Sequence, residues 1–288
     1  MIVVSGASGR LGRRTVEELV QRVDAGRVVA LTRRPDAIAG LGVVARFADF
    51  DEPESLTRAF DGAERLLIVS VGGDDRLPAH RRAVDAAVAA AVGQVVFTSF
   101  TRAAEPGNPN RHVAEFAATE QVLAGSGLPF TVLRFNLWPE TLLQVGVAQR
   151  AVATGVLPSN GGDGRVGHVT RDDSAAVAAA VLAEGGSHGE ILEITGPAAV
   201  TDADIAAALS EATGRRVRHE RVDDTHIVAA LLANGISTPF ARPLGADGIA
   251  RRNGWFDMTT HAVPRLTGRP ATSIVDYFTR QRAELLTV

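Results

Sequence analysis

Residues 2–12 decide the fold, because a short apolar run there leads directly into three evenly spaced glycines: Ile2-Val3-Val4-Ser5-Gly6-Ala7-Ser8-Gly9-Arg10-Leu11-Gly12. The apolar run predicts a buried strand, and the pattern that follows predicts a helix over about 11–23. In a strand–turn–helix setting, Gly6 permits a tight turn, Gly9 lets a pyrophosphate approach the backbone, and Gly12 lets the helix pack closely.

The start of this helix would present free N–H groups and a positive dipole end to an anion. We therefore predict a dinucleotide-binding loop whose contacts also include Ser8, Arg10 and Leu11. The alternative is a glycine-rich turn that binds no ligand.

The same rhythm of apolar run and helical pattern repeats along the first half of the chain. Continuous Val, Ile and Leu runs are typical of parallel strands buried on both faces. We predict a doubly wound, mostly parallel Rossmann-type α/β sheet, with any ligand crevice at the carboxyl ends of its strands. Strands are expected at 2–5, 28–32, 43–47, 65–69, 94–99 and 130–134, and helices at about 11–23, 54–60, 77–92 and 112–126.

The pattern changes after Arg134. A helix is expected over 136–154, and after a glycine-rich loop we expect a strand near 166–169, a helix over about 172–183, a strand over 190–194, and mostly helices from 201 onward. We therefore predict two parts. A dinucleotide-binding domain comprises 1–135 plus about 170–195, and a smaller, mixed, mainly helical substrate-binding lobe comprises about 136–169 plus 196–288.

The end of the second expected strand bears on the choice between NAD and NADP. An NAD site usually has an acidic residue there for the ribose 2′-hydroxyl, whereas this strand is followed by Arg33 and Arg34. Guanidinium groups suit a 2′-phosphate. The sequence therefore favours NADP(H) over NAD(H), with a solvated arginine pair as the alternative.

The ends of the later strands supply further candidate cofactor contacts. Asp49 could accept a hydrogen bond from the adenine amino group and Phe50 could pack on the ring, although both suit a surface loop. The remaining expected cofactor contacts follow the fourth, fifth and sixth strands: Ser70, Val71, Thr98, Ser99 and Asn136.

The composition excludes several classes of site. The 30 basic residues are all arginine and the 33 acidic residues give a net charge of −3, so nucleic acid is not an expected partner. Cysteine is absent, which excludes thiolate nucleophiles, and the histidines show no metal-ligand spacing. We expect a cytoplasmic protein without a targeting or membrane-spanning segment, and the oligomeric state stays open.

Several motifs, in this order, resemble the NmrA-like branch of atypical short-chain dehydrogenases/reductases, in particular its bacterial NAD(P)H:quinone oxidoreductase type. They begin with Gly6-Ala7-Ser8-Gly9 and Leu31-Thr32-Arg33-Arg34-Pro35, and continue with Val96-Phe97-Thr98-Ser99-Phe100, Leu133-Arg134-Phe135-Asn136 and Leu266-Thr267-Gly268-Arg269-Pro270. The resemblance spans nearly the whole chain. It implies a Rossmann-type domain with a smaller substrate lobe.

The sequence departs from typical short-chain dehydrogenases at their Tyr-x-x-x-Lys motif. That motif would fall on His112 and Phe116, the chain has no lysine, and its one tyrosine is Tyr277. Reduction of a quinone yields a phenolate-like oxygen with a pKa near 10, roughly that of Tyr, so it needs little help from an acid. His112 could supply a proton and Ser99 could orient a carbonyl. Equally, His112 fits a surface position, and Ser99 could bond only to nearby backbone.

Aromatic residues suggest where a substrate would lie. Phe100 ends the fifth strand, Leu137 and Trp138 follow the sixth, and Trp255 could join Trp138 in a planar slot, with hydrophobic filling as the alternative. The leading hypothesis is an NADPH-dependent reductase of a quinone or conjugated aromatic carbonyl, which could be an aromatic natural product. The alternatives are a non-catalytic NADP(H)-sensing regulator and an isomerase or epimerase that retains its cofactor.

Overall fold

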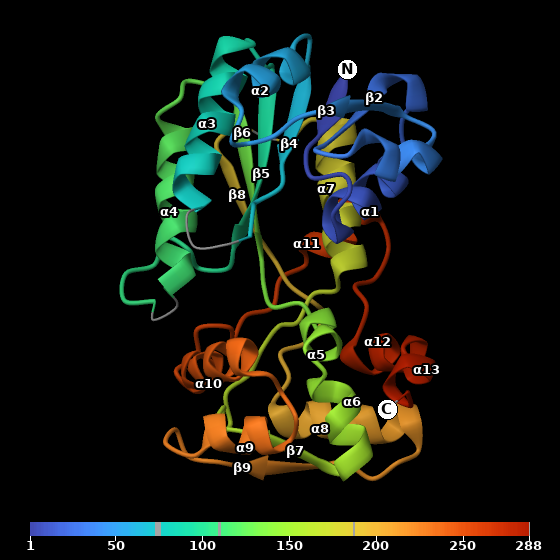
Figure 1. Ribbon diagram of the computed structural model, residues 1–288, viewed down its shortest axis with the longest axis vertical. Coiled ribbons are helices and arrows are strands. Elements are labelled where there is room, and N and C mark those ends of the chain that lie inside the picture. The colour runs from blue at the N-terminus through green and yellow to red at the C-terminus, as the bar shows by residue number, and fades with distance from the viewer. Residues whose placement is uncertain (73–75, 109–110, 187, 288) are drawn as a thin grey trace.

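The computed structural model describes residues 1–72, 76–108, 111–186 and 188–287, except the side chains of 111 and 112. A seven-stranded, fully parallel sheet has the order β3-β2-β1-β4-β5-β6-β8. It occupies the upper half of the molecule in Figure 1. The strands are β1 (Ile2–Val4), β2 (Val28–Thr32), β3 (Val44–Phe47), β4 (Arg65–Ile68), β5 (Gln94–Phe100), β6 (Phe130–Phe135) and β8 (Glu190–Ile194).

Helices cover both faces of this sheet, as the continuous apolar strands predict. One apolar layer joins the sheet to α1 (Arg10–Leu19) and α7 (Arg171–Glu184). The other joins it to α2 (Pro53–Phe60), α3 (Arg76–Ala89) and α4 (Arg111–Ala124). The predicted doubly wound Rossmann-type fold is therefore confirmed.

The strand order reverses between β1 and β4, because β2 and β3 lie on one side of β1 while β4, β5 and β6 lie on the other. Loops at the carboxyl ends of β1 and β4 therefore diverge and leave a crevice between them. In open α/β sheets ligands bind at such a switch point.

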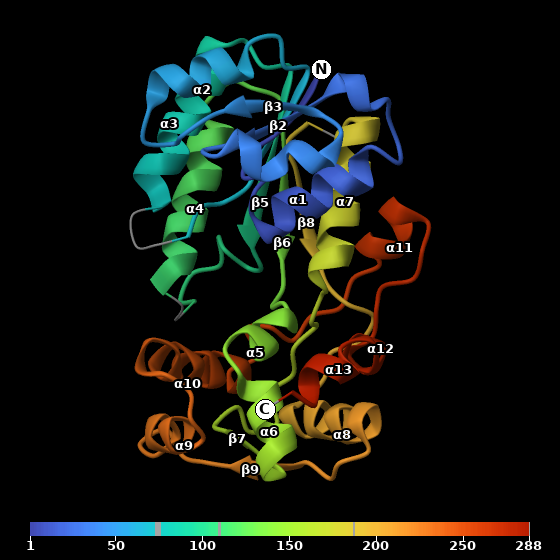
Figure 2. The same cartoon turned by 45° about the vertical axis from the view of Figure 1, so that its right-hand side comes forward.

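A smaller lobe with its own apolar core lies below the sheet (Figures 1 and 2). It contains a two-stranded parallel sheet of β7 (Val156–Ser159) and β9 (Arg218–Arg221). Around this sheet are α5 (Glu140–Gln144), α6 (Val147–Thr154), α8 (Asp202–Thr213), α9 (Ile227–Ala233), α10 (Thr238–Arg252), α12 (Ile274–Arg280) and α13 (Arg282–Leu285), while α11 (Ala262–Thr267) packs on α7. The predicted division at about 135, 170 and 195 stays a prediction.

Two predicted elements of this lobe are wrong. The helix expected over 136–154 is replaced by α5 and α6, which are separated at Gly146, whose φ is +81°. The strand expected near 166–169 is reduced to one antiparallel bridge between Val166 and Val200. Val166 and Val169 are buried by contacts between the two parts of the molecule, which produced a strand-like pattern without a strand partner.

Backbone hydrogen bonds join the segments that cross between the sheet and the lobe. The N–H of Gly167 donates to Phe256 O at 3.1 Å, and the N–H of Val169 donates to Leu137 O at 3.2 Å. A Cβ at Gly167 would lie 2.0 Å from Met258 O. Only glycine at position 167 lets the backbone come this close to Met258 O. These crossing segments (residues 136–138, 166–169 and 256–258) therefore fix how the lobe meets the carboxyl edge of the sheet.

Candidate functional site

The loop between β1 and α1 has the geometry of an anion-binding turn. Gly6 has a φ of +63° and its carbonyl accepts the N–H of Gly9 at 2.8 Å. A Cβ at Gly12 would lie 2.3 Å from Gly6 O, so the helix can approach the loop only with glycine there. Gly9 caps α1 without a side-chain bond and the first turn carries no acid. The first-turn N–H groups are therefore available to a pyrophosphate.

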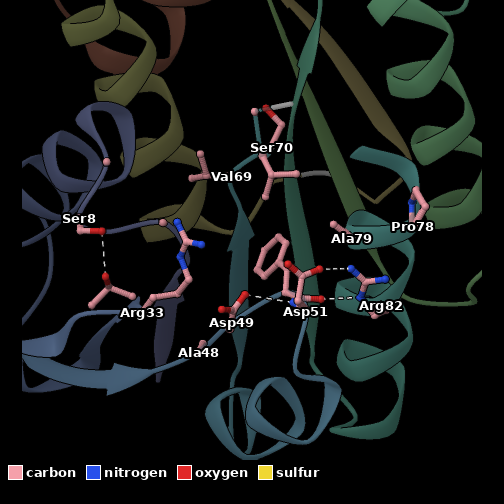
Figure 3. A pocket seen from close by; sticks show the side chains of 16 residues that line it. Ser8, Arg33, Ala48, Asp49, Asp51, Val69, Ser70, Pro78, Ala79 and Arg82 are labelled. Carbon is pink, nitrogen blue, oxygen red and sulfur yellow. Dashed lines mark hydrogen bonds and ion pairs between the residues drawn. The ribbon is translucent and has the colours of Figure 1, made fainter. Parts of the chain in front are cut away.

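A cleft of about 1060 Å³ starts at this loop and runs across the switch point to α3. Figure 3 shows Ser8 and Arg33 on one side, Pro78 and Arg82 on the other, and Asp49 and Asp51 along the rim. The predicted contacts that line it are Gly6, Ser8, Gly9, Arg33, Asp49, Phe50, Ser70 and Val71. Its size and its position at the phosphate loop fit the adenosine half of a dinucleotide.

The structure separates the two predicted arginines. Arg33 lines the cleft, whereas Arg34 is exposed outside it. The N–H of Arg34 donates to Thr32 Oγ1 at 3.1 Å, and this hydroxyl donates to Ser8 Oγ at 2.8 Å. The end of β2 is thereby tied to the phosphate loop, and of the two arginines only Arg33 lines the cleft.

Arg82 closes the opposite wall, and sequence reasoning missed it. Its Nε donates to Phe50 O at 2.6 Å, and its guanidinium pairs with Asp51. These bonds hold the loop after β3 against α3. The sequence carries no local signal for this contact, because Arg82 reads as an ordinary exposed position of a helix.

A buried histidine supports the floor of the cleft. His80 Nε2 accepts the N–H of Val71 at 3.1 Å, so Nδ1 carries the proton and donates to Thr119 Oγ1 at 2.9 Å. Burial, and then the charge of Arg76, lower the pKa of His80 to about 4. His80 is therefore neutral at physiological pH and positions the segment after β4.

Thr98 also holds the segment after β4 that forms the floor of the cleft. Its hydroxyl accepts the N–H of Ser70 at 2.9 Å, and it is buried rather than among the cleft-lining residues. Thr98 therefore supports the cleft through Ser70, and its predicted contact with the cofactor stays a prediction.

The predicted role of Ser99 in orienting a carbonyl disagrees with its position. Ser99 Oγ donates to Glu120 at 2.6 Å, and Arg134 donates to both oxygens of the same carboxylate, at 2.9 and 2.6 Å. Arg134 also pairs with Glu193 at 3.3 Å. The bonds from Glu120 raise the pKa of Arg134 despite its burial. Ser99 thus belongs to a buried ion network on the α4 side of the sheet.

The predicted slot of two tryptophans does not form. Trp138 Nε1 donates to Ser174 Oγ of α7 at 3.0 Å, and Arg171 stacks 4.7 Å above the indole ring. Trp255 lies instead in a cluster with Phe100 and Leu137. Leu137 packs with Trp255, whereas the next residue, Trp138, packs against the apolar layer of α1 and α7, so the two tryptophans lie in different clusters.

The residues around Trp255 form a half-buried, mainly aromatic cluster at the junction of sheet and lobe. Phe100 packs edge-on against buried Phe256, with ring centres 6.0 Å apart, and stacks on Phe116 at 6.0 Å and 22°. By the spacing given above, Phe116 is the position at which typical short-chain dehydrogenases would have the lysine of their Tyr-x-x-x-Lys motif. We define Phe100, Phe116, Leu137 and Trp255 as the aromatic cluster.

The remaining residues predicted to bind the cofactor or to donate a proton do not line the cleft in the described residues. Asn136 Nδ2 donates to Phe256 O at 3.1 Å and its Oδ1 accepts the N–H of Leu137 at 2.8 Å, so its amide holds the crossing. Arg10 lines a separate cavity, while Leu11 and Gly12 are buried at the start of α1. The side chain of His112 lies outside the described residues, and its role stays a prediction.

No group of His, Asp or Glu in the described segments is arranged to hold a metal ion. Across those same segments, no helix combines the length and the apolar character that crossing a membrane requires.

The comparisons with known proteins agree with this geometry. A family model described as NAD(P)H-binding matches residues 6–185. Quinone oxidoreductase 2 of Escherichia coli is 34% identical over 283 residues, which cover 96% of each chain.

Two solved structures share the fold along nearly the whole chain. The NADPH-dependent quinone oxidoreductase of Escherichia coli, in complex with NADPH, has a TM-score of 0.91 and 32% identity, covering 98% of this chain and 99% of its own. Triphenylmethane reductase of a Citrobacter species, in complex with NADP(H), has a TM-score of 0.89 and 30% identity, covering 98% and 100%. The resemblance seen in the sequence motifs is therefore confirmed, and the chain belongs to the NAD(P)H-binding family of oxidoreductases.

Proposed function

We propose that this protein is an NADPH-dependent reductase of a quinone or a similarly conjugated aromatic carbonyl, acting in the cytoplasm. The observation that carries the proposal is the aromatic cluster, which adjoins the carboxyl ends of β5 and β6 on the crevice edge of the sheet. Relatives named for quinone and triphenylmethane reduction support planar aromatic substrates. The substrate could equally be an aromatic natural product.

When bound, NADPH supplies the hydride. The first-turn N–H groups of α1 bind its pyrophosphate, Arg33 binds its 2′-phosphate, and the residues after β4 carry its central part. The aromatic cluster stacks the substrate ring and excludes water. Because a quinone product oxygen has a pKa near that of Tyr, about 10, a missing Tyr-Lys pair does not prevent turnover.

The main test is NADPH oxidation against a panel of benzoquinones and naphthoquinones, with cofactor affinity measured alongside by calorimetry. Turnover with several quinones and none with aliphatic ketones is the expected result. Turnover of aliphatic ketones would instead require a strong proton donor, and would overturn the proposed mechanism.

A second candidate function is NADP(H) sensing without turnover. The observation that favours it is the ion network that holds the Ser99 hydroxyl on Glu120 and away from a substrate. Tight NADPH binding together with no oxidation across the whole quinone panel would establish this alternative.

Cofactor preference gives a sharper prediction. Arg33→Ala should weaken NADPH binding by about tenfold or more and leave NADH unchanged, because a charge-assisted bond to the 2′-phosphate is lost. Arg34→Ala is the matched control and should change neither affinity, since Arg34 lies outside the cleft. Calorimetry with both cofactors measures this. Equal NADPH and NADH affinities in the unmodified protein would contradict the assignment.

The aromatic cluster gives another prediction. Trp255→Ala should lower kcat/KM for a naphthoquinone by about tenfold or more, because the stacking surface that sets the hydride distance is lost. Trp138→Phe should have little effect, because Trp138 packs against α7. Steady-state kinetics on both variants checks this. The reverse ranking would move the substrate site to the Trp138 side.

A further inference from the structure

A second cavity, of about 370 Å³, lies between the two parts of the molecule and shares no lining residue with the cofactor cleft. Its walls come from the beginnings of α1 and α7 above and from α5 and α12 below. Figure 2 shows α12 below the lower ends of α1 and α7. Five arginines line this cavity, against three carboxylates.

Three of these arginines form no ion pair in the described residues. Arg14 is held by Glu17, Glu18 and Asp172 at 2.9–3.2 Å, and Arg13 donates to Ala37 O at 2.8 Å. In the part of the chain that the structure describes, no carboxylate lies within ion-pair distance of the other three, which are Arg10, Arg171 and Arg280.

The charges of Arg10 and Arg171 also act on each other. Burial lowers the pKa of Arg171, Glu140 opposes this change, and the charge of Arg10 adds to it. One oxygen of Glu140 accepts the backbone N–H of Arg171 at 2.7 Å, the other is buried without a partner in the described residues, and burial raises the pKa of this carboxyl. Two like charges that face one cavity repel each other, and an anion between them would turn this repulsion into attraction.

The one tyrosine of the chain supplies an independent observation. Tyr277 lines the cavity and is only 6% exposed, yet its hydroxyl has no hydrogen-bond partner among the described residues. Its oxygen is not one of the buried polar atoms that lack a partner in the described residues, so the hydroxyl is open to the cavity and can donate there. Burial raises the pKa of Tyr277, so the group remains a neutral donor. An acceptor inside the cavity would satisfy it.

We propose that this cavity binds a phosphate group, either inorganic phosphate or the phosphate of a small phosphorylated metabolite. Arg10, Arg171 and Arg280 would bind its oxygens through their guanidinium forks, with Tyr277 donating a further hydrogen bond. The volume leaves room for an organic group beyond the phosphate.

This site would couple the two parts of the molecule. Arg10 and Arg171 belong to helices that pack on the large sheet, whereas Tyr277 and Arg280 belong to α12 of the lobe. An anion held by all of them bridges the junction. The proposal is independent of which substrate the aromatic cluster takes.

The test is calorimetric titration of inorganic phosphate into protein saturated with NADPH, so that the phosphates of the cofactor already occupy their own sites. Arg280→Gln and Tyr277→Phe should each weaken phosphate binding, the arginine variant by about tenfold, without changing NADPH affinity. Tyr277→Phe keeps the buried ring, so it tests the hydroxyl alone. Arg58→Gln, on α2 and 74% exposed, is the matched control and should bind phosphate normally.

Glycerol 3-phosphate distinguishes the two sources of phosphate. Tighter binding than inorganic phosphate indicates a phosphorylated metabolite, and equal or weaker binding indicates the free ion. Three results would overturn the proposal: no binding heat with the unmodified protein, unchanged affinity in both cavity variants, or loss of phosphate binding when NADPH is present. The last result would assign these arginines to the cofactor.

Discussion

Gly9→Val is expected to abolish measurable NADPH binding while the protein stays folded. Gly9 stands at the cap of α1, where the pyrophosphate must approach the backbone, and a valine side chain would occupy that path. In the structure a Cβ at Gly9 would lie 3.1 Å from Gly6 O, so the loop backbone must shift by a few tenths of an ångström to accept it. The variant should therefore lose affinity by about a hundredfold or more without losing its fold.

Calorimetry with NADPH measures the loss, and circular dichroism with urea unfolding verifies the fold. The matched control is Gly40→Val, because a Cβ at Gly40 meets nothing within 4 Å. Unchanged NADPH affinity in Gly9→Val would show that the glycine-rich turn is not the cofactor site.

Glu120→Ala is expected to lower the free energy of unfolding by about 3–5 kcal/mol, since it leaves the charge of Arg134 buried and uncompensated. The Glu120 and Arg134 side chains are only 7% and 10% exposed. Glu193 keeps one weaker contact with Arg134 and cannot replace the paired bonds that Glu120 accepts. Ser99 would lose its partner as well.

Urea unfolding measures this effect. Glu54→Ala is the control, because that carboxylate is 94% exposed, lies 4.0 Å from Arg58 and should contribute less than about 1 kcal/mol. A loss in Glu120→Ala no larger than in Glu54→Ala would mean that the network carries no stability.

The sheet could be predicted because its central strands are short, continuous apolar runs bounded by turn residues. A strand that is buried on both faces has apolar side chains at successive positions, as Val28–Thr32 shows. The helices and strands of the smaller lobe were harder to predict from the sequence, because they are short and mix polar with apolar positions. The exposed strand Arg218–Arg221 has no apolar run at all. Gly146 was the one local signal that the helix expected over 136–154 is interrupted.

The residues of the candidate site also fall into two groups: those that local sequence predicts and those that depend on tertiary packing. The phosphate loop and Arg33 could be placed because motif and position are local in sequence. The separation of Arg33 from Arg34, and of Trp138 from Trp255, depends on tertiary packing that no local pattern shows. Arg82 contributes to the cleft through a contact between α3 and a distant loop, which no local pattern records.

The packing of α1 against α7 has a consequence for how the chain folds. Arg14 on α1 is bonded to Asp172 at the start of α7, and the two helices share one apolar layer, although more than 150 residues separate them. During synthesis the helix of the phosphate loop therefore emerges long before the helix that covers it. Such non-local contacts slow folding. We expect a nascent chain that ends before residue 170 to expose the apolar side of α1 to chaperones, and to become protease-resistant only after α7 and β8 are complete.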